Sequence, residues 1–440
     1  MLDGRSLAQS STSGLLSCVT LAIRAALVAI IFVTFCDAPV GRAALAQEDP
    51  WTMGMGPTGP GTGGSADREF IKEWEGNPPP GYPTLSAANI AAIQAAIKTY
   101  TQIVADGGWS VVPDVEMRSG DTHFAVSVLR DRLAKSGDLK DASSGGEHFE
   151  WTLETAVKHF QATNGLTPTG IVDKRTIVAL NVPAAGRLKQ LKTNLGRLQQ
   201  YDGLSKKRYV VVNIPAAQVE AVEANKVYAR YAGVVGKPDR ATPLLRSTIS
   251  QLNFNPVWRL PPTVISKDLI PRGREMQQAG KNVLVKFGID AYDGSGKKVD
   301  PEKIDWSSAQ PNSFSYSQQP GKENPLGFLK INFNSAESVY MHDTPKESLF
   351  GRNFRAASSG CIRVNNIQHS AVWLLRSNPG YDEYRIQQIK ESGQRGNVTL
   401  KSPVPLYFVY ITAWATEDGV IQFRRDLYNK DGIGETAGTY

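Results

Sequence analysis

The hydrophobic pattern of this chain changes its period near residue 200. Before that point, apolar residues recur at helical spacing, as at Ile90, Ile93 and Ile97. After it, short apolar runs over residues 209–214 and 328–333 alternate with glycines and prolines, which is typical of strands and turns. The sequence therefore predicts an α+β protein with several domains, in which a helical N-terminal part precedes a mainly β part.

The first 46 residues have the features of an export signal. Arginines flank and precede an apolar run over residues 25–33, and residues 44–46 read Ala-Leu-Ala, an A-x-A cleavage pattern. The run is too short to span a bilayer comfortably. We expect residues 1–46 to be a cleaved signal peptide and the protein to be periplasmic, with a retained membrane anchor as the alternative.

Composition divides the remaining chain. Glycine and proline are abundant in residues 47–85, which are predicted to be a linker. Residues 86–182 are predicted to be helical, residues 183–430 to form the mainly β domain after one leading amphipathic helix, and residues 431–440 to be a C-terminal tail. A more polar stretch over residues 266–320 is predicted to be an insertion that either covers a site or is a surface excursion without function.

Charge limits the kind of partner. The formal net charge is +7, which favours an anionic partner such as a cell-wall polymer, a membrane surface or nucleic acid. The basic residues are scattered and form no dense block, and export argues against nucleic acid. A generally solvated basic surface is the alternative explanation.

Cys361 becomes the only cysteine once the predicted signal, which contains Cys18 and Cys36, is removed. In an oxidising compartment an unpaired thiol suggests a reactive group, although a buried inert thiol is the alternative. His342 ends an alternating strand pattern and is the candidate base for this thiol. Gly360 allows a tight bend, so the N–H groups of Gly360 and Cys361 are candidate oxyanion donors.

Other chemistries find less support. The remaining histidines lack metal-ligand spacing and Cys361 has no neighbouring ligands of that kind, so neither a metal nor a cofactor is expected. A serine nucleophile at Ser358 or Ser359 lacks the G-x-S-x-G pattern.

Residues 160–173 resemble the small helical peptidoglycan-binding domain that accompanies many cell-wall enzymes. Asn164-Gly165 is predicted to end one helix and Asp173 to cap the next. The resemblance covers about residues 120–182 and implies contact with peptidoglycan strands.

Two further segments resemble the L,D-transpeptidase family (YkuD-type), in its large branch with a peptidoglycan-binding domain and an inserted capping subdomain. They read Tyr-Met-His-Asp-Thr-Pro over residues 340–345 and Ser-Ser-Gly-Cys-Ile-Arg-Val over residues 358–364. Many members have histidine where this chain has Ser359, and the large branch is similar to this chain in using serine.

The resemblance implies a mechanism. Cys361 would attack the diaminopimelate–D-alanine bond of a tetrapeptide stem, and the resulting thioester would pass to an amine of a second stem, giving a 3→3 cross-link. His342 would act as base and then acid, oriented by the backbone carbonyl of Asp343. Water, a D-amino acid or a wall-attached lipoprotein are alternative acceptors, other wall-synthesis proteins are possible partners, and carbapenems are expected inhibitors. A noncatalytic wall-binding protein is the remaining alternative.

Substrate contacts are predicted from residue type. Arg355 and Arg363 are candidates to clamp a stem carboxylate, with Arg352 a weaker one, and structural pairing within the loop is the alternative. Tyr340 and Trp258 are candidates to line the donor groove, although aromatic residues in strands are more often core. Ser358 and Ser359 are candidate substrate contacts because they precede Gly360-Cys361.

Overall fold

The structure, a computed structural model, describes residues 83–201, 208–416 and 419–433. The predicted signal peptide, nearly all of the predicted linker and the end of the predicted tail lie outside the described residues. Within the described ranges, no helix combines the length and the apolar character needed to cross a membrane.

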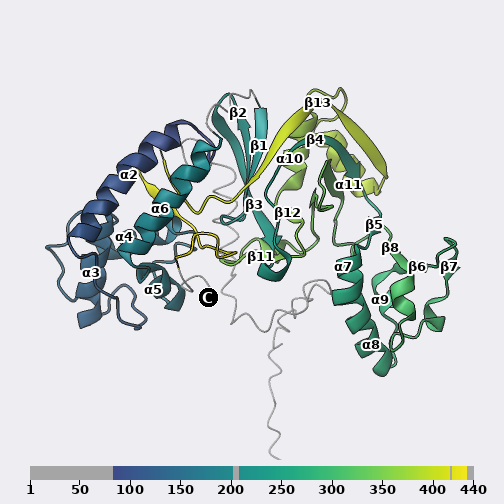
Figure 1. The fold of residues 1–440 in the computed structure, drawn as a ribbon, viewed down its shortest axis with the longest axis horizontal. Coiled ribbons are helices and arrows are strands. Elements are labelled where there is room, and N and C mark those ends of the chain that lie inside the picture. Colours follow the sequence, from purple (N-terminus) through teal and green to yellow (C-terminus); the bar gives the residue numbers. More distant parts are fainter. Residues whose placement is uncertain (1–82, 202–207, 417–418, 434–440) are drawn as a thin grey trace, which may run out of the picture. The chain divides into compact units, whose positions relative to one another are not determined.

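The N-terminal part is helical, as the apolar spacing predicts (Figure 1). The helices are α2 (Ala88–Ala105), α3 (Phe124–Ser136), α4 (Trp151–Thr163), α5 (Lys174–Leu180) and α6 (Ala184–Gln199). Helices α3, α4 and α5 share one core that includes Leu129, Leu153 and Phe160. The predicted caps are confirmed. Asp173 accepts a hydrogen bond from the Thr176 N–H at 2.9 Å, and Gly165 after α4 has the left-handed φ of +72°.

Nine strands form the main sheet, in the order β11-β3-β12-β10-β9-β4-β13-β1-β2. Because β2 also pairs with β3, this sheet closes on itself. The strands are β1 (Arg208–Asn213), β2 (Gln218–Glu223), β3 (Lys226–Gly236), β4 (Leu245–Phe254), β9 (Leu329–Phe333), β10 (Met341–His342), β11 (Ala356–Ser358), β12 (Ile362–Val364) and β13 (Gly396–Val409).

The apolar run in β1 is continuous because both faces of this strand are buried. Val210 and Val212 point into the core of the closed sheet, which α10 (Ile367–Leu375) and α11 (Glu383–Ser392) complete. Tyr209 and Val211 alternate with them and join a second core with α2 and α6. The helical and β parts of the sequence therefore share a hydrophobic core.

The predicted insertion is a subdomain with its own core. It contains α7 (Pro262–Val264), the π-helical turn η2 (Ile265–Leu269), α8 (Ile270–Gln278), α9 (Val283–Phe287) and a sheet in the order β5-β8-β6-β7, whose strands are Trp258–Arg259, Ser315–Gln318, Ile289–Tyr292 and Lys298–Val299. A Cβ on Gly273 would lie 2.2 Å from the Trp306 ring, so only glycine lets α8 pack on that indole. The buried core extends from Trp258 to Leu326, beyond both ends of the predicted insertion at residues 266–320.

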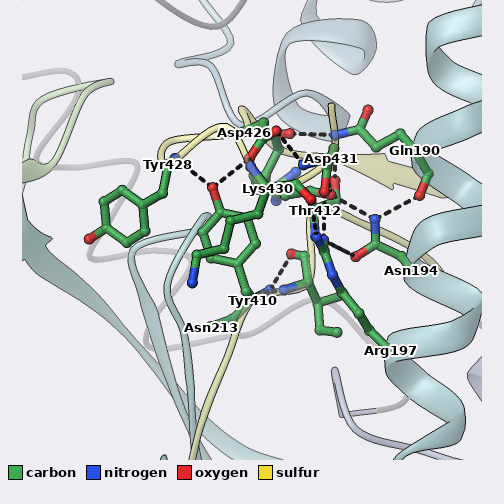
Figure 2. Close-up of polar contacts among 12 residues, drawn as sticks. Gln190, Asn194, Arg197, Asn213, Tyr410, Thr412, Asp426, Tyr428, Lys430 and Asp431 are labelled. Atoms are coloured by element: carbon green, nitrogen blue, oxygen red, sulfur yellow. Dashed lines mark hydrogen bonds and ion pairs between the residues drawn. The ribbon is translucent and has the colours of Figure 1, made fainter. Parts of the chain in front are cut away.

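The C-terminal segment is held by a buried polar network (Figure 2). It follows β14 (Ala413–Ala415) and β15 (Ile421–Phe423). Asp431 is 4% exposed, accepts a hydrogen bond from Thr412 Oγ1 at 2.6 Å and pairs with Arg197 of α6 at 2.6 Å. The prediction that a tail begins at residue 431 is therefore wrong at that residue, because the Asp431 carboxylate is buried among donors.

Candidate active site

A row of polar residues crosses the centre of the main sheet. Lys330 of β9 is the Cα partner of His342 in β10, and His342 is the Cα partner of Arg363 in β12. The adjacent row, formed by Ile331, Met341 and Ile362, is buried in the core of the closed sheet. Because side chains alternate along a strand, the polar row lies on the opposite face of the sheet.

Cys361 comes directly before β12, so it lies beside this row. Its thiol is half-buried and forms no disulfide. The preceding Gly360 has φ of +110°, a left-handed conformation that favours glycine. As the sequence predicts, the chain bends tightly just before the thiol.

The nucleophile turn, residues 358–361, is fixed by hydrogen bonds. Ser358 Oγ donates to the Cys361 carbonyl at 2.6 Å and accepts from the Gly360 N–H at 3.1 Å. Thr242 Oγ1 donates to the Gly360 carbonyl at 2.9 Å. The turn is held both from within and from the segment that joins β3 to β4.

The electrostatics of Cys361 combine opposing effects. Burial raises the pKa of the thiol above its usual value. Hydrogen bonds from Tyr340 and the positive charges of Lys330 and Arg363 oppose this increase. The thiol is therefore mainly protonated at neutral pH, and a nucleophilic reaction requires a base.

His342 ends β10, where the alternating pattern predicts a strand end. It is 4% exposed, and its Nδ1 lies 2.5 Å from the Asp343 carbonyl oxygen. A carbonyl only accepts hydrogen bonds, so Nδ1 carries the proton and Nε2 is the basic nitrogen. The geometry fits the carbonyl role expected of Asp343.

The side chain and the backbone of Asp343 make different contacts. Its Oδ2 accepts a hydrogen bond from the Phe328 N–H at 3.0 Å. Burial raises the pKa of this carboxyl. The Asp343 carboxylate thus stabilises the approach to β9, and it is the Asp343 backbone that contacts the imidazole.

Gly360 and Ser358 differ from expectation. Gly360 N–H was expected to face an oxyanion, but it donates to Ser358 Oγ and is occupied within the turn. Ser358 is 4% exposed and uses its hydroxyl for the same turn, so the contacts of this hydroxyl lie within the turn. The sequence does not predict these two contacts, because a serine hydroxyl bonds to backbone groups two and three residues away only when the chain bends in a particular way.

Arg355 also differs from expectation. Its guanidinium donates to the carbonyls of Gly233 (3.2 Å), Arg352 (3.0 Å) and Ala216 (3.0 Å). These contacts join the loop before β11 to the β3 edge. The clamp role expected of Arg355 is therefore not supported, and structural pairing, the alternative, describes this residue.

Tyr340 and Trp258 lie next to one another. Trp258 is 5% exposed within the core of the inserted subdomain, and its Nε1 donates to Tyr340 Oη at 3.0 Å. Lys330 Nζ lies 4.2 Å from the centroid of the Tyr340 ring. Tyr340 therefore contacts the cysteine, the lysine and the inserted subdomain, whereas Trp258 reaches the site through Tyr340.

Sequence reasoning missed Arg240, which approaches from the β3–β4 segment. Its Nη1 donates to Ser359 Oγ at 2.8 Å, and its guanidinium forms a bidentate pair with Asp268 of the inserted subdomain at 2.6 and 3.0 Å. The Asp268 side chain is 1% exposed. No sequence pattern indicates this pairing, because it joins residues that are distant in the chain.

Tyr428 supports the same segment from the C-terminus. Its Oη donates to the Gly236 carbonyl at 2.7 Å and accepts from the Thr242 N–H at 3.1 Å. Its own N–H donates to Tyr410 Oη, which donates to Asp426 (Figure 2). This network therefore extends to Thr242, whose hydroxyl donates to the Gly360 carbonyl.

Sequence reasoning also missed Lys330. The alternation over residues 329–333 places Lys330 on the polar face of β9, but only the register shows that it lies opposite His342. In the three described ranges, no group of three or more His, Cys, Asp or Glu side chains is placed to hold a metal ion.

A half-buried cysteine just before β12 and a carbonyl-oriented histidine on the adjacent strand β10 are the arrangement expected for acyl transfer to a thiol. Residues 207–381 match the family model described as L,D-transpeptidase catalytic domain, and residues 122–180 match the one described as "Putative peptidoglycan binding domain". The chain thus contains an L,D-transpeptidase catalytic domain preceded by a peptidoglycan-binding domain.

Similar proteins agree with this assignment. The curated "Putative L,D-transpeptidase" of Haemophilus influenzae is 33% identical over 223 residues, which are 50% of this chain and 44% of that relative, so the match spans less than half of the relative's length.

Among solved structures, an L,D-transpeptidase from Mycobacterium smegmatis is 15% identical, with 46% of this chain and 58% of that chain covered and a TM-score of 0.22. One from Stackebrandtia nassauensis is 13% identical, with 68% and 96% covered and a TM-score of 0.25. These scores are low, and the assignment depends on the sequence matches.

Proposed function

We propose that this protein is a peptidoglycan L,D-transpeptidase that uses Cys361 as its nucleophile and His342 as its base. The observation that carries the proposal is the His342 imidazole, whose Nδ1 is tied to the Asp343 carbonyl on the strand beside Cys361. Residues 1–46 support export, so we propose that the reaction occurs in the periplasm.

In the first half-reaction, His342 Nε2 takes the proton of the Cys361 thiol, and the sulfur attacks the carbonyl carbon of the diaminopimelate–D-alanine bond. We assign the role of oxyanion donor to the Cys361 N–H alone, because the Gly360 N–H already donates to Ser358 Oγ. The C–N bond then breaks, His342 gives its proton to the departing amine, and a thioester remains.

In the second half-reaction, the side-chain amine of another stem attacks the thioester carbon. His342 accepts the proton of that amine, the C–S bond breaks, and His342 returns the proton to sulfur, which restores the thiol. The positive charges of Lys330 and Arg363, which lower the pKa of Cys361, also favour sulfur as a leaving group.

The test is to incubate the purified protein with disaccharide tetrapeptides and to analyse the products by mass spectrometry. We expect 3→3 linked dimers with the wild-type protein and none with Cys361→Ala. His342→Gln should reduce the rate by about 10²–10⁴-fold, because the thiol then lacks its base. Tripeptide monomers alone would indicate a carboxypeptidase, and unchanged substrate with folded protein would contradict the proposal.

A further inference from the structure

Lys330 lies beside His342 and Cys361, and so far only the effect of its charge on the thiol has been assigned. Its β9 position is opposite His342, and Arg363 follows on the other side of the histidine. The two cations differ in access, because Arg363 is 4% exposed whereas Lys330 is only half-buried. A ligand that approaches Cys361 can therefore reach Lys330.

The ammonium of Lys330 is held without a carboxylate. Its Nζ lies over the Tyr340 ring at 4.2 Å, and among the residues that the structure describes no Asp or Glu forms an ion pair with it. Asp343, which follows His342 in the chain, uses its carboxylate to accept a hydrogen bond from the Phe328 N–H. Burial also lowers the pKa of Lys330. A partly desolvated cation of this kind gains most from an anion that arrives with the substrate.

The thiolate of Cys361 cannot be that anion throughout the reaction. Once the thioester forms, the sulfur no longer carries charge, while the ammonium stays in place. The donor brings its own anion, since the carboxylate of the leaving residue is separated from the reacting carbonyl carbon only by the amide nitrogen and one carbon. When that carbon reaches Cys361, this carboxylate must lie close by.

We propose that Lys330 binds the C-terminal carboxylate of the leaving residue of the donor stem and so selects donors that end at that residue. This inference depends on the proposed transpeptidase function and specifies which group of the donor Lys330 binds. A donor extended by one residue, or one that ends in a carboxamide, presents no charge at this position. Such a donor cannot form the charge-assisted hydrogen bond with Lys330.

The test compares three donors with one acceptor: the tetrapeptide, its C-terminal carboxamide and the corresponding pentapeptide. The ratio of kcat/KM between donors cancels general changes in Cys361 reactivity, because every donor is attacked by the same thiol. Lys330→Met removes the charge at similar volume, and Lys330→Arg keeps it. Lys401→Met, on the exposed side of β13, is the matched control. Thermal melting verifies that each variant is folded.

We expect the wild-type protein and Lys401→Met to prefer the tetrapeptide over its carboxamide by about ten- to a hundredfold. Lys330→Met should lose this preference by slowing the carboxylate donor more than the other two, and Lys330→Arg should keep much of it. An equal loss on all three donors would overturn the proposal and make Lys330 merely a support for the thiol. No turnover of any donor by the wild-type protein would instead overturn the transpeptidase function.

Discussion

The reactivity of Cys361 is set by opposing effects on one sulfur atom. Burial favours the neutral thiol, whereas Tyr340, Lys330 and Arg363 favour the thiolate. Burial dominates, because the pKa of the thiol is raised despite these three residues. We therefore propose that the resting protein holds a neutral thiol, which His342 activates when substrate is bound.

Tyr340→Phe tests this balance. Loss of the phenol removes a donor to sulfur, so the pKa of Cys361 should rise further and the alkylation rate at a fixed neutral pH should fall. The measurement is the rate of iodoacetamide alkylation as a function of pH. Tyr384→Phe, at a side chain that is 72% exposed on α11, should leave the midpoint unchanged. A lower midpoint for Tyr340→Phe would contradict this description of the site.

The segment between β3 and β4 contacts the nucleophile turn at two residues. Arg240 contacts Ser359 and Thr242 contacts Gly360. Asp268 of the inserted subdomain pairs with Arg240, and Tyr428 of the C-terminal segment donates a hydrogen bond to the Gly236 carbonyl. The inserted subdomain is thus coupled to the turn that carries the nucleophile.

A double-mutant cycle on Arg240 and Asp268 measures that coupling. Arg240→Met should lower the free energy of unfolding by about 3–5 kcal/mol, since it leaves the buried Asp268 carboxylate without its partner. Asp268→Leu should cost less, because Arg240 keeps a second acidic partner in Asp239 at 3.7 Å. The double variant should lose less than the sum, and the two variants that lack Arg240 should acylate Cys361 more slowly because Ser359 loses its donor. Urea unfolding and acylation rates supply the data. Strictly additive losses would exclude an energetic coupling.

For the whole molecule, the sequence was most informative where local rules act. The period of the apolar residues, the Asp173 cap and the strand end at His342 all depend on neighbours in the chain, and each is confirmed. The contact between Arg240 and Ser359 and the register that places Lys330 opposite His342 were not predicted. Both depend on the strand order, which brings together residues far apart in the sequence and leaves no local pattern.

The same reason explains why the contacts of Arg355 and Gly360 differ from expectation. Arg355 has the residue type of a carboxylate clamp, but the closed sheet surrounds it with backbone carbonyls that satisfy its donors. The Gly360 N–H has the right position in the chain for an oxyanion donor, yet the bend turns it toward Ser358. Residue type predicted the available chemistry, and the three-dimensional environment decided its use.

The central claim is that Cys361 becomes acylated with the help of His342. Intact-mass spectrometry of the protein after exposure to a carbapenem tests it most directly. We predict one adduct, mapped by peptide analysis to Cys361, that is absent in Cys361→Ala and forms more slowly in His342→Gln. A folded wild-type protein that gains no mass, or an adduct that persists in Cys361→Ala, would contradict the account.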